Sequence, residues 1–408
     1  MSYLYSNSAT NPITRATRSF VNLLSRGGSA WLVILASLLL SIISIAAIDV
    51  AETLDPTKSL GPIASRQVLY VVAGCIACAI VALPHYRKFG PWSWAAAAGV
   101  LVLLLFLLIP FIPSSIVRPR GGARSWIDLG PMDFQPSELA KLVYIVVLAW
   151  YLRYRRNHRT MKGLLPPAII TAIPVGLIML QPDLGTALLF IPALFFVLIA
   201  AGAKLKHLVI VITIAILAAP AAYPLLKPHQ KQRIVGLVSH WTSEDSERSR
   251  ADELGINMQG LTAQRLIGAG RIAGTSDEHA RALQRFNALP ERHNDMVFSP
   301  IVTRFGLLGG VVVLALFALW MLGALWTAAA CNEPFGRLMC VGACGFLFAQ
   351  VMINLGMNLG LLPIIGITLP YVSHGGSSML LQWLIAGLVL NVGLRRESFE
   401  YGRNWDDE

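Results

Sequence analysis

Residues 288–300, ALPERHNDMVFSP, place an acid, a base and a histidine directly before a long apolar segment. Charged residues at the mouth of an apolar span mark a candidate polar site, with Asp295 as its acid. The other interpretation is that Asp295 only caps or pairs locally, and the residues alone leave both open. We interpret His293 as a residue that holds the loop or contacts a phosphate.

The apolar segment after this stretch has the features of a helix start. Ser299 and Pro300 are residue types favoured at the N-cap and in the first turn of a helix. Arg304 then falls in the first turn, where the helix dipole disfavours a cation. We therefore expect an anionic group near Arg304, either Asp295 or a bound phosphate.

A second polar cluster lies at residues 118–142, RPRGGARSWIDLGPMDFQPSELAKL. Its arginines, Arg124 among them, stand beside Trp126, a residue type that anchors chains at a membrane surface. Glu138 and Lys141 are one helical turn apart and can pair. Charges within a span normally face the protein interior or a cavity, so this pair either fixes helix packing or forms a wall of a polar site.

Two shorter segments also place polar residues at the ends of apolar runs. In residues 181–189, QPDLGTALL, Asp183 stands at a helix start, where capping is the simplest interpretation. Residues 360–380, GLLPIIGITLPYVSHGGSSML, are rich in Gly, Pro and small polar types, which suits irregular backbone at membrane depth. The glycines before Ser377 could present N–H groups to an anion or could simply form a tight loop.

The chain that carries these clusters is strongly apolar. Of its 408 residues, 55% are hydrophobic and 13% are charged, and the mean hydropathy is +0.61. Soluble domains carry about 25% charged residues, whereas each membrane-spanning helix needs roughly 20 apolar residues. The sequence therefore predicts an all-α polytopic membrane protein with ten transmembrane helices, at residues 30–48, 67–83, 92–112, 139–152, 165–180, 184–201, 208–226, 301–326, 339–359 and 379–394.

The distribution of Lys and Arg predicts the orientation. With a cytoplasmic N-terminus, the inner segments hold sixteen of these residues and the short outer loops hold five. We expect cytoplasmic tails at 1–28 and 397–408, a membrane domain at 29–396, and a large extracytoplasmic loop at 227–300 between helices 7 and 8. All four polar clusters then lie on the outer side. The net charge of +11 is mainly a topology signal, which argues against a nucleic-acid partner.

Five motifs, in this order, resemble the SEDS family (shape, elongation, division and sporulation). They are GARSWI…FQPSELAKL, QPDLGTAL, LIGAG, LPERHNDMVF…FGLLG and LPYVSHGGSS, and the resemblance spans residues 30–396. The stretch GLLPIIGITLP is closer to the rod-shape branch (RodA) than to the division branch (FtsW). The resemblance implies a ten-helix SEDS fold in the inner (plasma) membrane. It also implies polymerisation of lipid II into glycan strands during cell-wall elongation, with a class B penicillin-binding protein, a transpeptidase, as partner.

The resemblance also carries over site residues. The acidic residue of the family's large outer loop falls on Asp295, as the base for the C4 hydroxyl of the N-acetylglucosamine in lipid II. Cationic side chains could stabilise the departing undecaprenyl pyrophosphate. No metal-ligand pattern is legible, so no cofactor is assigned, although Mg²⁺ or Mn²⁺ could share that role. The resemblance places Arg124, near Trp126, and Glu138, Lys141 and Asp183 among the site residues. The residues assigned to substrate binding are these together with His293, Arg304 and Ser377 from the polar clusters above.

The sequence departs from the family pattern near these residues. Asn294 stands where the family usually reads Thr, and His374 stands where it reads Tyr. Three other functions remain as alternatives: a lipid II flippase, a non-catalytic scaffold and the division-specific paralogue. A flippase would need polar residues through the depth of several spans, and a scaffold would not need Asp295.

The ninth predicted span carries small residues on one helical face. Gly345, Ala349, Met352 and Gly356 follow a spacing of 4, 3 and 4 residues. Small residues let helices approach closely in lipid. This face packs either on another span of the same chain or on the transmembrane helix of the partner.

Overall fold

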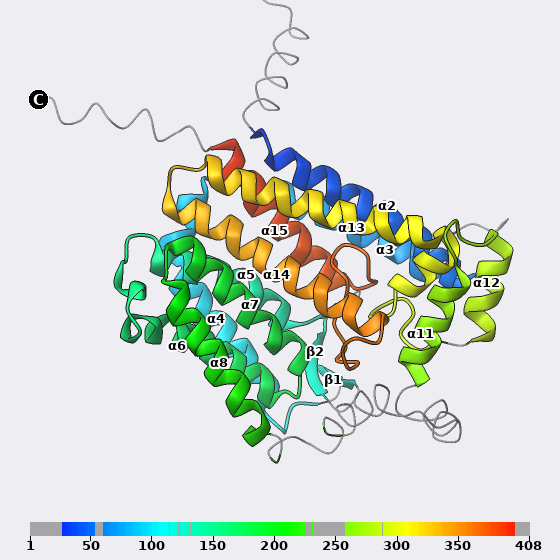
Figure 1. The fold of residues 1–408 in the computed structure, drawn as a ribbon, viewed down its shortest axis with the longest axis horizontal. Coiled ribbons are helices and arrows are strands. Elements are labelled where there is room, and N and C mark those ends of the chain that lie inside the picture. The colour runs from blue at the N-terminus through cyan, green and yellow to red at the C-terminus, as the bar shows by residue number, and fades with distance from the viewer. Residues whose placement is uncertain are drawn as a thin grey trace, which may run out of the picture.

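The computed structural model describes residues 27–53, 60–113, 115–120, 123–130, 132–222, 224, 231, 258–287 and 289–395. The two predicted tails therefore lie almost entirely outside the described residues, and the bounds of these tails stay predictions. Among the described residues, eight helical segments are long and apolar enough to cross a membrane (Figure 1). They are α2 (Ala30–Glu52), α3 (Pro62–Ala82), Tyr86–Leu108 with α4 (Phe89–Leu108), Lys162–Leu180 with α6 (Leu165–Leu180), α7 (Leu184–Ala201), α13 (Phe298–Ala330), α14 (Pro334–Asn358) and α15 (Gly376–Leu394).

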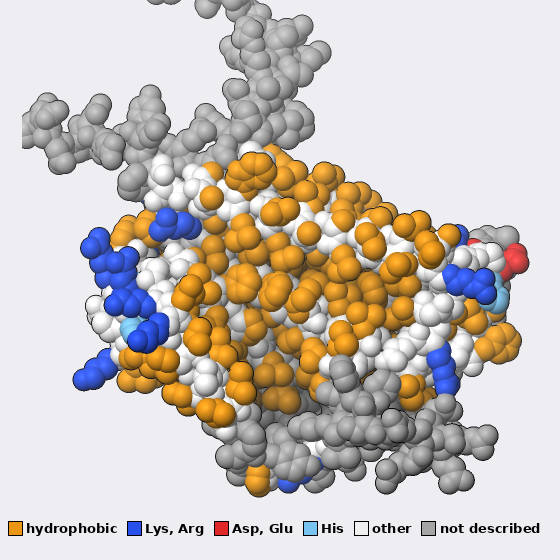
Figure 2. All heavy atoms as spheres, viewed as in Figure 1, with side chains coloured by type: hydrophobic (Ala, Val, Ile, Leu, Met, Phe, Trp, Pro, Cys, Tyr) orange, Lys and Arg blue, Asp and Glu red, His pale blue; other side chains and the backbone are white. Residues whose placement is uncertain are grey.

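Two further helices stand at the other predicted positions. They are α5 (Pro136–Leu152), with 17 residues, and α8 (Leu205–Ala222), whose apolar stretch Leu205–Leu217 is shorter than a usual span. Each of the ten predicted runs thus overlaps one helix. Figure 2 shows apolar side chains over the middle of the molecule, with many Lys and Arg at the end that carries the loop between α5 and α6. The chain is a multi-pass membrane protein, as the sequence predicts.

The expectation of a purely helical chain needs one correction. Three short strands, β1 (Val117–Arg120), β2 (Ala123–Asp128) and β3 (Asp133–Phe134), form an antiparallel sheet in the order β1-β2-β3. Arg118 pairs with Trp126 across the first two strands, and Ile127 pairs with Phe134 across the next two. Prolines and glycines keep this segment from being helical, and strand pairing satisfies its backbone N–H and C=O groups instead.

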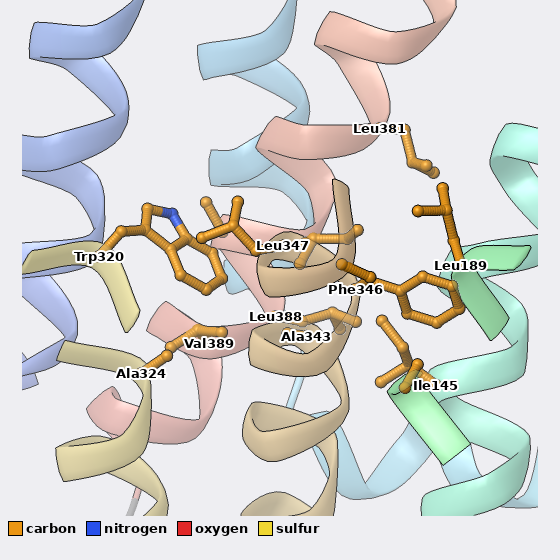
Figure 3. Close-up of a cluster of buried hydrophobic side chains, with 14 of the residues drawn as sticks. Ile145, Leu189, Trp320, Ala324, Ala343, Phe346, Leu347, Leu381, Leu388 and Val389 are labelled. Carbon is orange, nitrogen blue, oxygen red and sulfur yellow. The ribbon is translucent and has the colours of Figure 1, made fainter. Parts of the chain in front are cut away.

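The two C-terminal helices form the centre of the bundle. In α14 and α15, 83% of the apolar window is buried, against 44% or less in the other spanning segments. On one side α15 packs on α3 and α2, and α13 packs on α2, while on the other side α14 packs on α7 and α5. Figure 3 shows this core, where Phe346 of α14 lies among side chains from the neighbouring helices.

Small residues on α14 make this close packing possible. A Cβ atom on Gly345 would lie 2.9 Å from Phe196 Cβ and 3.0 Å from Ala193 Cα of α7. Gly345 is buried at this contact, so the partner-docking interpretation is wrong at this position and the internal interpretation is confirmed. The reason is that α7 already occupies the groove that the missing side chain leaves.

The long helix α13 is interrupted near its outer end. Gly306 has φ 72° and ψ −172°, which divides the helix into a short outer piece and the main span. The Gly306 backbone contacts the backbone of Gly274 and Ile272 so closely that a side chain at this position would clash. The predicted helix start near Ser299 is therefore the start of the outer piece, and the Ser299 hydroxyl donates to Ala263 O at 3.2 Å instead of capping.

Of the predicted outer loop 227–300, the structure describes residues 231, 258–287 and 289–300. It contains the short helices α11 (Met258–Ala269) and α12 (Asp277–Phe286). The first of these ends in a turn at Gly270, whose N–H donates to Ile267 O at 3.1 Å. Both helices pack against the outer piece of α13.

Candidate functional site

The four polar clusters meet at one end of the bundle. The segment before α13 is joined to the 359–375 loop, because His374 N donates to His293 O at 2.7 Å and Ser373 Oγ donates to Asn294 O at 2.6 Å. The start of α15 is joined to the start of α5 by a 3.2 Å hydrogen bond from Gln135 N to Ser377 Oγ. Hydrogen bonds thus connect segments that are up to about 240 residues apart in the sequence.

Asp295 is held through its backbone. Asn354 Nδ2 and Asn358 Nδ2 of α14 both donate to Asp295 O, at 2.8 Å and 3.0 Å. Both asparagines are completely buried. Asn354 Nδ2 also donates to Ile367 O at 2.7 Å, so one amide fixes Asp295 to α14 and to the 359–375 loop together.

The carboxylate of Asp295 faces a glycine of that loop. A Cβ atom on Gly366 would lie 3.4 Å from Asp295 Oδ2, and Gly366 has φ +84°, a conformation that other residues rarely adopt. The absence of a side chain at Gly366 leaves space beside the carboxylate. Asp295 itself is half-buried, which suits a group that must meet a substrate.

Asp183 caps α7 and joins a second cluster. Its Oδ1 accepts from Thr186 N at 3.0 Å, which is the predicted capping contact. Its Oδ2 accepts from Gln135 Nε2 at 3.0 Å and from Ser137 Oγ at 3.4 Å, at the start of α5. Asp183 therefore does more than cap, because it fixes the start of α7 to the start of α5.

Glu138 and Lys141 form the predicted pair inside the bundle. Lys141 Nζ lies 2.7 Å from Glu138 Oε1, and the two side chains are 1% and 8% exposed, respectively. Glu138 Oε2 is buried and accepts no hydrogen bond from the described residues. A buried pair with an unused oxygen is suited to a polar group that arrives from outside.

Arg124 and Trp126 lie on strand β2, outside the helical bundle. Arg124 Nη1 donates to Pro110 O at 2.9 Å and Arg124 Nη2 donates to Ile112 O at 2.7 Å. These bonds attach β2 to the segment after α4. The remaining donors of the guanidinium group are those that could reach a pyrophosphate.

Arg304 has an anionic neighbour, but not the expected one. Arg304 Nε donates to Asp277 Oδ1 of α12 at 3.1 Å, so the expectation that Asp295 would be this anion is wrong. Burial alone would raise the pKa of the Asp277 carboxyl, but hydrogen bonds and charge from Arg281 and Arg304 outweigh it and lower this pKa. Local spacing carries no sign of this pairing, because it forms only when α12 folds back onto the outer piece of α13. A role for Arg304 toward pyrophosphate stays a prediction.

Two histidines belong to the joined segments around Asp295, since His374 N donates to the backbone oxygen of His293. Burial lowers the pKa of His374 to about 4, with smaller contributions from the nearby positive charges of His293 and Arg66. His374 Nδ1 lies 3.0 Å from Oε1 of the buried Gln67. Burial and the nearby charge of Arg292 also lower the pKa of His293, and its role in holding the loop or contacting a phosphate stays a prediction.

Three polar residues of this site were missed from the sequence. These residues are Gln67, Asn354 and Asn358, which are fully buried in helices whose other residues are mostly apolar. The sequence could have indicated them, because an amide side chain in the outermost turns of a predicted span needs a hydrogen-bond partner. Within the ranges that the structure describes, no three His, Cys, Asp or Glu side chains come together as a metal site.

Comparison with known proteins gives consistent matches. Residues 24–398 match the family of FtsW, RodA and SpoVE, described as "Cell cycle protein". Stage V sporulation protein E of Bacillus subtilis is 32% identical over 81% of this chain and 86% of its own length. Peptidoglycan glycosyltransferase MrdB of Escherichia coli K12 is 30% identical over 79% and 85%. A probable peptidoglycan glycosyltransferase FtsW of Nitrosococcus halophilus is 33% identical over 81% and 82%.

Two solved structures have the same fold. One is described by the words "structural coordination of polymerization and crosslinking by a peptidoglycan synthase complex". It matches with a TM-score of 0.73 and 29% identity over 90% of this chain and 98% of its own. The rod shape determining protein RodA of Thermus thermophilus matches with a TM-score of 0.64 and 28% identity, over 90% of this chain and 97% of its own.

Proposed function

Since the chain belongs to the SEDS family of FtsW, RodA and SpoVE proteins, we propose that it polymerises lipid II with Asp295 as the general base. The chain is a peptidoglycan glycosyltransferase, as its relatives named MrdB and FtsW are. The assignment of Asp295 as the base rests on its position. Two buried asparagines hold its backbone at the place where the four motif segments meet.

In the proposed reaction, Asp295 takes the proton from the C4 hydroxyl of the acceptor sugar. The hydroxyl oxygen then forms a bond with the anomeric carbon of the growing strand, and the bond from that carbon to undecaprenyl pyrophosphate breaks. A base held by its own backbone keeps its position as the substrate arrives, which reduces the reorganisation that the reaction requires. The space beside Gly366 is where the acceptor hydroxyl would approach.

The departing pyrophosphate needs nearby positive charge. Lys141 uses one of its three ammonium donors on Glu138, and Arg124 is anchored by two carbonyl oxygens with further N–H groups remaining. These two cations are therefore assigned to the leaving group. Asp183 and Ser377 position the start of α5 that carries Lys141. A divalent cation could add to this charge, and the donors above do not define a site for one.

We place this site on the outer face of the membrane. The eight spanning segments, together with α5 and α8, make the ten transmembrane helices expected for the family. Both termini are then cytoplasmic, and the loop 227–300 between the seventh and eighth of these helices is extracytoplasmic. The exposed cations Arg155, Arg156 and Arg159 at the other end of the bundle support this orientation.

The partner and the biological process follow from the family. A similar structure is a complex that couples polymerisation to crosslinking, and we propose that this chain works with a class B penicillin-binding protein. Elongation and shape maintenance are assigned from the rod-shape motif, with division as the alternative. Co-purification with partners of each branch separates these two processes.

Purified protein with lipid II, with and without its partner, tests the assignment on a gel of glycan strands. Asp295→Asn keeps the size and removes the base, so we expect a folded protein that loses at least about a hundredfold in rate. The exposed Glu278 of α12 offers a matched control, since Glu278→Gln should keep the wild-type rate. Strands at near wild-type rate from Asp295→Asn would refute the role. Transfer of lipid II between leaflets without strand formation would favour the flippase alternative.

A further inference from the structure

A cavity of about 420 Å³ opens at the same end of the bundle, between α2, α12 and the outer piece of α13. One wall of the cavity is apolar and the other is charged. Apolar side chains, including Ile42, Ala46 and Phe305, form one side, and Asp49, Asp277, Arg281 and Arg304 form the other. None of these residues takes part in the reaction proposed above, except that Arg304 was a candidate from the sequence.

The charged wall is a continuous chain of ion pairs. Arg281 bridges two acids, with Nη2 at 2.7 Å from Asp49 Oδ2 and Nε at 2.7 Å from Asp277 Oδ2. Asp277 Oδ1 in turn accepts from Arg304 Nε. The wall therefore alternates in sign and sums to zero net charge.

The two arginines differ in what they can still bind. The Arg281 side chain is 6% exposed and also donates to the backbone oxygens of Asp49 and Thr53, so it serves as an internal anchor. The Arg304 side chain is 31% exposed, and its Nη1 donates to Thr275 O. Its Nη2 makes no hydrogen bond to the residues that the structure describes, so a donor remains available on a side chain that lines the cavity.

The apolar wall extends into the level of the lipid chains. Ile42 is 60% exposed and Phe305 is 38% exposed, although both are large and apolar. Ile42 lies ten residues before the end of α2 at Glu52, which places it roughly 15 Å along the helix from that end. With the end of α2 at the height of the lipid head groups, as proposed above, the cavity reaches into the acyl region, whereas a water-soluble ligand would need no apolar wall.

We propose that this cavity binds a zwitterionic phospholipid of the outer leaflet. The phosphate lies against Arg304 Nη2, the ammonium group lies against the exposed edge of Asp277, and the first acyl carbons lie on Ile42 and Phe305. A wall with both signs of charge matches a head group that carries both signs, while a purely anionic head group would also meet Asp277 as a like charge. Such a lipid would link α2 to α12 and so brace the outer loop segment.

The test is lipid retention by the full-length protein. The protein is extracted from nanodiscs that contain equal amounts of phosphatidylethanolamine and phosphatidylglycerol, and the retained lipids are counted by native mass spectrometry. We expect one phosphatidylethanolamine to be retained in preference to phosphatidylglycerol. Equal retention of the two lipids, or preference for the anionic one, would overturn the proposal.

Two variants locate the site. Ala46 is exposed, so Ala46→Phe should fill the cavity without disturbing the ion pairs, and Ala73→Phe on the exposed side of α3 is the matched control. Arg304→Gln should weaken retention by about tenfold through loss of a charge-assisted hydrogen bond, and Arg285→Gln on α12 is its control. Retention that survives Ala46→Phe in a folded protein would show that the lipid binds elsewhere.

Competition identifies the ligand class. Inorganic phosphate and soluble phosphoethanolamine should not displace the lipid at millimolar concentration, because neither contacts the apolar wall. If either displaces it, the site is an anion site and not a lipid site. If undecaprenyl pyrophosphate displaces it at equimolar amounts, the cavity belongs to the substrate and the proposal is wrong. None of these measurements requires glycan synthesis, so their outcome is independent of the role of Asp295.

Discussion

Replacing Glu138 by alanine removes one partner of a buried ion pair and leaves Lys141 without its counter-charge. Both side chains are almost inaccessible to solvent and their charged atoms are 2.7 Å apart. Loss of one partner of such a pair costs about 3–5 kcal/mol, because the remaining charge stays buried and unpaired. The entropy of unfolding is about 2.1 cal/mol/K per residue. The fall in Tm is the lost free energy divided by the total unfolding entropy of the 408 residues, which gives about 3–6 °C.

The assay is thermal unfolding of the detergent-purified protein, followed alongside strand formation from lipid II. Glu278→Ala, on the exposed face of α12, is the control and should change the free energy of unfolding by less than about 0.5 kcal/mol. The double variant Glu138→Leu with Lys141→Met removes both charges and fills the space. We expect it to regain most of the stability, since an apolar pair of similar volume is often as stable as a buried ion pair.

Activity separates packing from chemistry in this series. If Lys141 stabilises the leaving group, the double variant should be stable and still make no strands. A double variant that is stable and active would show that the pair only fixes packing. If Glu138→Ala unfolds at the wild-type temperature, the reasoning from an uncompensated buried charge is refuted.

Further perturbations test other parts of the structure. Asn354→Ala removes the amide that holds Asp295 and Ile367, so kcat should fall at least about tenfold with little change in KM, and an unchanged kcat would exclude a positioning role. The pKa of His374 is lowered to about 4 from an ordinary value near 6.5, so the unfolded chain binds a proton between these values that the folded chain does not. Folding stability should therefore be full above pH 6.5 and decrease toward pH 4, and His374→Gln should flatten this part of a Tm-against-pH curve. Gly345→Leu should lower expression and Tm of the protein expressed without its partner, because the new side chain meets Ala193 and Phe196, and normal stability would contradict the internal packing. In a cysteine-free background, Glu278→Cys should react with impermeant maleimide on spheroplasts and Arg156→Cys should not, and the reverse pattern would overturn the orientation.

The sequence determined the membrane class and the positions of the eight helices that are long and apolar enough to cross a membrane, and it singled out the segments that form the candidate site. These are local properties, because the bilayer imposes a length and a composition on each span independently of its neighbours. The Glu138–Lys141 pair and the capping contact of Asp183 were equally predictable, since both depend on residues one helical turn apart.

The tertiary structure decided which residues meet across the sequence. Arg304 pairs with Asp277 because α12 folds back onto α13, and Asp295 is held by Asn354 and Asn358 because α14 ends beside the outer loop. The break at Gly306 and the close approach of Gly345 to α7 depend on backbones that meet only in the folded chain. Contacts of this kind carry no signature in local spacing, since the partner of each group is chosen by the packing of the whole bundle.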